Sequence, residues 1–108
     1  MDLPLVEEIR RGLHERTVNF LFEAAQRVPG GLAEDCLKRA LKLEPLHEPA
    51  LQAYLKLLLE RGRRTEALRR YRIFAEHLKK DVGLEPLLET RRIVQSWPGD
   101  IPRLTQDY

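Results

Sequence analysis

The fold of this chain is indicated by two similar segments, AEDCLKRALKLEP at residues 33–45 and ALRRYRIF at residues 67–74. Each begins with an alanine and continues with apolar residues three or four positions apart, and the two alanines are 34 residues apart. That spacing places apolar side chains on one face of an α-helix. A fixed period of this length is typical of proteins built from repeated helix pairs. The two segments therefore predict the second helix in each of two consecutive pairs.

The order of small and large residues is similar to that of the tetratricopeptide repeat. In the first segment the alanine, bulky residue, alanine and proline are Ala33, Leu37, Ala40 and Pro45. A small residue is needed where paired helices cross closely, because a larger side chain would wedge them apart. We therefore expect Ala33 and Ala67 to face their partner helices.

Helix-ending residues extend this pattern along the chain. Gly30 and Gly31 are expected to end the first helix, Gly62 the third and Gly83 the fourth, and Pro86 suits the first turn of a fifth. The predicted helices are near residues 5–28, 32–43, 48–60, 64–80 and 86–97. The predicted fold class is all-α: a tetratricopeptide-like right-handed superhelix of two antiparallel helix pairs plus a C-terminal capping helix. Residues 1–97 are expected to form this helical-repeat domain, and residues 98–108 an irregular C-terminal tail.

The first predicted helix carries two apolar stripes. The longer stripe predicts the core side of the helix and consists of Val6, Ile9, Leu13, Thr17, Phe20, Ala24 and Val28. The second stripe includes Val18 and Phe22, and repeat geometry would place it on the concave side, where repeat proteins commonly bind partners. The predicted partner-binding residues are Val18, Phe22, Gln52, Lys56 and Leu59. The alternative, which the sequence leaves open, is that this stripe belongs to the core.

Composition excludes several classes of protein. The single cysteine, Cys36, excludes an intramolecular disulfide framework and a multi-cysteine metal cage. We expect Cys36 to be a small, buried, apolar residue, and the low cysteine content suggests a reducing, cytoplasmic setting. His14, His47 and His77 lack the close spacing of zinc ligands, and no nucleophile, phosphate or dinucleotide motif is found. No apolar run is long enough to span a membrane. We therefore expect no catalysis, no metal and no cofactor.

Charge is distributed unevenly along the chain. Residues 1–54 have seven basic and nine acidic side chains, whereas residues 55–108 have twelve and eight. A basic cluster in the second half contains Arg61, Arg63, Arg64, Arg69, Arg70 and Arg72. Arginine binds phosphate and carboxylate groups, so this cluster is a candidate nucleic-acid or acidic-protein site. The alternative is an ordinary solvated helix face with intrahelical ion pairs.

Residues 39–92 resemble the bacterial transcriptional activator domain, an all-helical module found beside a winged-helix DNA-binding domain. The matching positions are Ala40, Leu41, Pro45, Glu48, Leu58, Gly62, Arg63, Ala67, Leu68, Tyr71, Leu78, Gly83, Glu85, Pro86 and Thr90. The region before residue 32 matches less well. The resemblance implies a tetratricopeptide-like fold in a transcription regulator, used for self-association, signal sensing or contact with the transcription machinery.

The sequence thus predicts a non-catalytic interaction module of a bacterial transcription regulator. Expected partners are a second copy in a homodimer, an adjoining DNA-binding domain or the transcription machinery, without sequence-specific DNA binding by this chain alone. One alternative is a nucleic-acid-binding helical protein that uses the basic cluster. Another is a general peptide-binding adaptor unrelated to transcription. The sequence offers no feature that separates this hypothesis from that of a transcription-regulator module.

Overall fold

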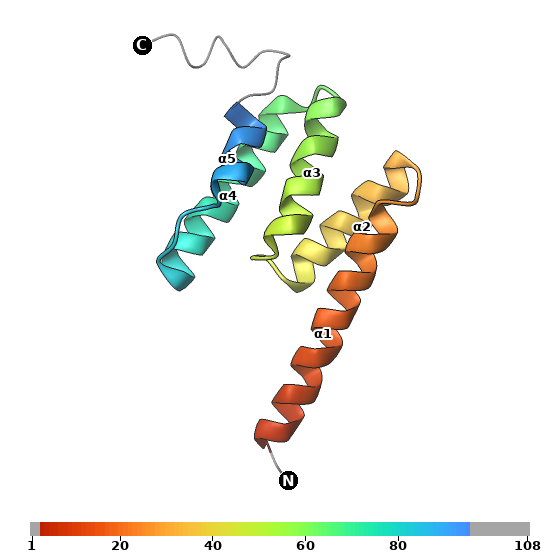
Figure 1. Ribbon diagram of the computed structural model, residues 1–108, viewed down its shortest axis with the longest axis vertical. Coiled ribbons are helices and arrows are strands. Elements are labelled where there is room, and N and C mark those ends of the chain that lie inside the picture. The colour runs from red at the N-terminus through yellow and green to blue at the C-terminus, as the bar shows by residue number, and fades with distance from the viewer. Residues whose placement is uncertain (1–2, 96–108) are drawn as a thin grey trace. The chain divides into compact units, whose positions relative to one another are not determined.

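The computed structural model describes residues 3–95, and this part of the chain is all-helical, as predicted (Figure 1). The helices are α1 (Leu3–Ala25), α2 (Gly30–Leu43), α3 (Glu48–Glu60), α4 (Arg64–Val82) and α5 (Leu88–Gln95). The predicted end of the fifth helix at residue 97 and the predicted tail at 98–108 lie outside the described residues. The chain divides into two compact units, one ending at Ala50 and the other beginning at Leu51.

In the first unit, α1 and α2 form an antiparallel hairpin, and the N-terminal part of α1 extends past the end of α2 (Figure 1). The buried residues of α2 are Ala33, Leu37 and Ala40, and within residues 5–25 of α1 they are Val18 and Ala25. The Phe22 ring lies against His47, with 5.7 Å between ring centroids. The Val18 side of α1 therefore faces the core of this unit.

The predicted core stripe of the first helix is wrong at its largest residues. Ile9, Leu13 and Phe20 are 56%, 52% and 70% exposed, whereas Val18 is 2% exposed. Both stripes have helical spacing, so periodicity alone does not decide between them. The turn after α1 decides, because it returns the chain to the Val18 side of the helix.

That turn also differs from the prediction. The amides of Gln26 and Arg27 bond to carbonyls three residues earlier, which ends α1 at Ala25. Pro29 then adopts an extended conformation and its carbonyl accepts the amide of Ala33, so α2 begins at Gly30. Gly30 and Gly31 therefore lie in the first turn of α2, where the prediction had them ending α1.

In the second unit, glycines end α3 and α4 as predicted. Gly62 and Gly83 have φ angles of 75° and 74°, a left-handed conformation that residues with a Cβ rarely adopt. The amide of Gly83 closes α4 by bonding to the carbonyls of Leu78 and Lys79. The core residues of the two helices are Leu51, Tyr54, Leu55, Leu58, Leu59, Ala67, Phe74 and Leu78.

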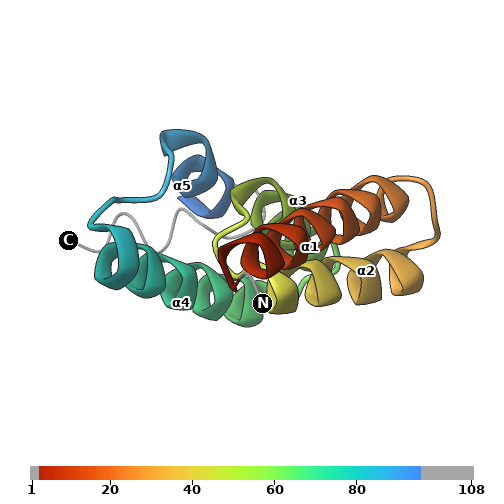
Figure 2. The same cartoon turned by 90° about the horizontal axis from the view of Figure 1, so that it is seen from below.

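The chain returns from α4 through residues 83–87 and runs along α5 in the direction opposite to α4 (Figures 1 and 2). Thr90 and Val94 are the buried residues of α5. The Gln52 amide donates a 2.8 Å hydrogen bond to the Thr90 hydroxyl, which joins α3 to α5. Pro86 is buried ahead of the helix, so it precedes the first turn of α5 where the prediction placed it within that turn.

Candidate interaction site

The second unit has a groove of about 700 Å³ between α4 and α5, which we call the α4–α5 groove. Its lining residues are Leu68, Tyr71, Arg72, Ala75, Glu76, Lys79, Lys80, Glu85, Val94 and Gln95. Leu68, Tyr71 and Ala75 recur every three or four residues along α4, and Val94 comes from α5. Helical spacing therefore gathers the apolar lining from one face of α4.

Exposure separates the lining into a base and an edge. Val94 is buried and the other apolar residues are half-buried, whereas every charged lining residue is exposed. On the edge, the Lys79 Nζ lies 3.6 Å from the Glu85 carboxylate. An apolar base with a few polar groups around it is the usual form of a binding site. The lining carries both signs of charge, which suits a mixed protein surface better than a run of phosphates.

The five predicted partner-binding residues do not form an open apolar stripe. Val18 and Leu59 are 2% and 5% exposed, so the expectation that they are exposed is wrong and they belong to the core. Phe22 and Gln52 are half-buried, and Lys56 is exposed. Gln52 is also engaged by Thr90. Val18 and Leu59 therefore fit the core alternative, and partner binding by Phe22, Gln52 and Lys56 stays a prediction.

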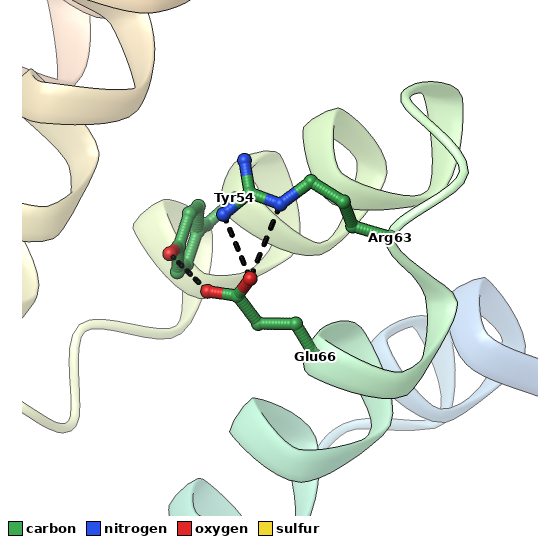
Figure 3. Close-up of polar contacts among 3 residues, drawn as sticks. All are labelled: Tyr54, Arg63 and Glu66. Atoms are coloured by element: carbon green, nitrogen blue, oxygen red, sulfur yellow. Dashed lines mark hydrogen bonds and ion pairs between the residues drawn. The ribbon is translucent and has the colours of Figure 1, made fainter.

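The arginines of the predicted basic cluster make different contacts. Arg63 donates two hydrogen bonds to the same Glu66 oxygen, 3.1 Å from Nε and 2.7 Å from Nη2 (Figure 3). The Arg70 guanidinium carbon lies 5.5 Å from the centroid of the Tyr54 ring. Arg72 lines the α4–α5 groove. Because successive residues of a helix turn by about 100°, Arg69 and Arg72 share one side of α4 and Arg70 points away from it. Phosphate binding by the cluster stays a prediction. Of the cluster's other members, Arg61 and Arg69 are exposed and Arg64 is half-buried.

A polar contact closes the turn between α3 and α4. The Tyr54 hydroxyl donates a 3.2 Å hydrogen bond to the second Glu66 oxygen (Figure 3). The hydrogen bonds from Arg63 lower the pKa of Glu66 below its ordinary value of 4.5, although partial burial opposes this. The hydrogen bonds from Arg63 and Tyr54 thus stabilise the ionised carboxylate of Glu66 and give it a structural role at the turn between α3 and α4.

The histidines and the cysteine of the chain are candidate metal ligands or nucleophiles. Among residues 3–95, no three His, Cys, Asp or Glu side chains gather as a metal site would require. His47 has a structural contact, because its Nδ1 accepts the amide of Ala50 in the first turn of α3. Cys36 is half-buried.

A second apolar surface lies on α1, and the sequence analysis had assigned most of it to the core. It consists of Leu5, Ile9, Leu13 and Phe20, which are 51% to 70% exposed, and we call it the outer face of α1. The residues are spaced by four, four and seven, so they share one side of the helix. This face and the α4–α5 groove are the surfaces that sequence reasoning missed. The Leu68, Tyr71 and Ala75 spacing was a signal for the groove.

Residues 3–95 thus form a small all-α structure that exposes two apolar surfaces, the outer face of α1 and the α4–α5 groove. The chain matches the family described as bacterial transcriptional activator domain over residues 2–96, and it belongs to that family. The match begins well before residue 32, so the first helix is part of the family domain, contrary to the weaker resemblance expected there. The chain is thus a module of the transcription-regulator type.

No match was found among curated proteins or among solved structures. None of the helices within residues 3–95 is both long enough and apolar enough to cross a membrane.

Proposed function

We propose that this chain is a non-catalytic protein-interaction module of a bacterial transcription regulator, acting in the cytoplasm through its α4–α5 groove. The observation that carries the proposal is the apolar base of the groove, which α4 and α5 leave uncovered and which has about 700 Å³ of space. Membership of the activator-domain family supports a role in transcription. The tetratricopeptide-like superhelix expected from the sequence would be consistent with this role, because helical repeats commonly present binding surfaces for other proteins.

The charges around the groove favour a protein over a nucleic acid. Arg72, Lys79 and Lys80 are accompanied by Glu76 and Glu85. A nucleic-acid backbone would meet repulsion at both carboxylates, and Lys79 is already engaged by Glu85. A protein segment with an apolar side and charges of both signs fits this lining.

A tethering experiment tests the proposal. The whole chain is fused to an unrelated DNA-binding domain whose site lies upstream of a weak bacterial promoter, and transcription of a reporter is measured. We expect the fusion to raise transcription several-fold over the DNA-binding domain alone. Ala75→Glu, which places a charge on the groove base, should abolish the increase. His77→Glu adds the same charge at an exposed position of α4 outside the groove lining, and should not.

Two results would reject the proposal. A fusion that leaves the promoter unchanged would favour an adaptor unrelated to transcription. Submicromolar binding of the isolated chain to duplex DNA, weakening steeply with salt and lost in Arg61→Ala with Arg69→Ala, would favour the nucleic-acid alternative.

A further inference from the structure

Two of the apolar surfaces exposed within residues 3–95 have complementary shapes. The outer face of α1 is a convex ridge on a helix that extends past its neighbour α2 (Figure 1). The α4–α5 groove is concave, with a base formed by Leu68, Tyr71, Ala75 and Val94. An amphipathic helix binds a groove of this kind by laying side chains four and seven residues apart along it. Leu5, Ile9, Leu13 and Phe20 have that spacing.

The two surfaces also differ in charge. Residues 1–50 have a net charge of −2 and residues 51–108 a net charge of +4. Over its whole length, α1 has four glutamates and three arginines, while the lining of the groove has three basic and two acidic residues. Pairing the outer face with another outer face, or a groove with another groove, would bring together like net charges. Pairing an outer face with a groove brings together opposite ones.

We propose that the outer face of α1 in one copy of this chain docks into the α4–α5 groove of a second copy. This inference rests on the proposed function and names a second copy as the partner. The contact is head-to-tail, so each added copy leaves one outer face and one groove open, and the assembly either grows or closes into a ring. One helix face is smaller than the roughly 800 Å² per partner of a standard interface, so the association is weak and strengthens with protein concentration.

The test uses two chains that each lack one surface. The face-blocked chain carries Ile9→Glu and Leu13→Glu, and the groove-blocked chain carries Ala75→Glu. Ile9 and Leu13 are more than half exposed, so the charges should not disturb the core. If Ala75→Glu lowers the melting temperature, the groove is instead blocked by Arg72→Glu with Lys80→Glu, both at exposed positions.

Sedimentation equilibrium over a concentration series gives the readout. The mass of the unaltered chain should rise above its monomer value of 12.7 kDa, while each blocked chain alone should stay at 12.7 kDa. An equal mixture of the two blocked chains should reach about twice the monomer mass and stop there, because one intact face meets one intact groove. His14→Glu with Asn19→Glu, and His77→Glu, are the matched controls, since they add the same charges at exposed positions outside both surfaces. These controls should associate as the unaltered chain does.

Four results would overturn the inference. An unaltered chain that stays monomeric at every concentration has no such contact. A groove-blocked chain that associates by itself pairs outer face with outer face, and a face-blocked chain that associates by itself pairs groove with groove. Association that appears only after removal of residues 96–108 would assign the groove to that segment. A monomeric chain that still activates the tethered promoter would leave the proposed function standing without the self-association.

Discussion

Tyr54 and Glu66 join α3 to α4 through a hydrogen bond of 3.2 Å between the phenol hydroxyl and a carboxylate oxygen. Tyr54 is 0% exposed, so its hydroxyl needs a partner inside the protein. Glu66 accepts from Arg63 with its other oxygen. The turn between the two helices is therefore held by a contact between a buried phenol, a carboxylate and a guanidinium group.

Tyr54→Phe should lower the free energy of unfolding by about 1 to 2 kcal/mol, because a hydrogen bond to a charged group is lost while the ring is kept. Urea denaturation at neutral pH measures the change, with the slope expected to stay the same because the buried area is nearly unchanged. Tyr71→Phe on α4 is the control, since Tyr71 is half-buried and lines the groove. Equal stability of Tyr54→Phe and the unaltered chain would contradict this role.

The lowered pKa of Glu66 predicts a dependence of stability on pH. A carboxyl whose pKa is lower in the folded state stabilises the protein fully above its unfolded value of about 4.5, and this contribution is lost as the pH falls through the folded value. The stability advantage of the unaltered chain over Glu66→Gln should therefore be constant near neutral pH and shrink below pH about 4.5. Urea midpoints of the two chains across this range measure it. Glu60→Gln makes the same substitution at an exposed position at the end of α3 and is the matched control.

Sequence reasoning was most successful where a residue type has only one structural use. The left-handed turns at Gly62 and Gly83 and the burial of Ala33 and Ala67 could all be predicted, because glycine and alanine are required there by backbone angle or by limited space. The core side of α1 could not be predicted. Val18 and Phe20 both belong to apolar stripes, and only the return path of the chain after Ala25 determines which stripe is buried.

The groove could not be predicted for a related reason. Tyr71 follows the helical spacing of the buried residues Ala67, Phe74 and Leu78, yet it is half-buried. Its exposure depends on where α5 returns beside α4, and that path is set by the segment after Gly83. A pattern along one helix contains no information on this path.

Gly12 and Gly62 should respond in opposite ways to substitution by alanine. An added Cβ would meet no atom within 4 Å at either position, so steric contact does not separate them. Gly12 lies within continuous α1, where alanine should raise the free energy of unfolding by about 0.5 to 1 kcal/mol. Gly62 has a φ of 75°, where alanine should lower it by about 1 kcal/mol. Thermal unfolding measures both, and a shift of the same sign in the two variants would contradict the backbone argument.

Ala67→Leu should lower the free energy of unfolding by about 1 to 3 kcal/mol, because Ala67 is 0% exposed and a larger side chain overpacks the interior. Ala75→Leu makes the same change on the same helix at a half-buried position beside the groove, and should cost less. Chemical denaturation compares the two. If Ala67→Leu melts within a degree of the unaltered chain, the helical-repeat register that places an alanine at this position is wrong.

Removing residues 86–108 should destabilise the second unit and promote aggregation. The deletion takes away Thr90 and Val94, which are buried in α5, and it removes the hydrogen bond that Gln52 donates to Thr90. It also removes the α5 side of the groove, which leaves the half-buried Leu68, Tyr71 and Ala75 on α4 more exposed. Light scattering and thermal unfolding of the shortened chain measure the effect. A shortened chain that is soluble and equally stable would show that α5 is not needed to cover α4.

Thr90→Val tests the contact between α3 and α5 by a single substitution, because it keeps the shape of the side chain but removes the acceptor of the hydrogen bond. It should lower the free energy of unfolding by about 1 kcal/mol, which corresponds to roughly 4 °C or more in melting temperature. A Thr90→Val variant of unchanged stability would show that the hydrogen bond from Gln52 does not contribute to stability.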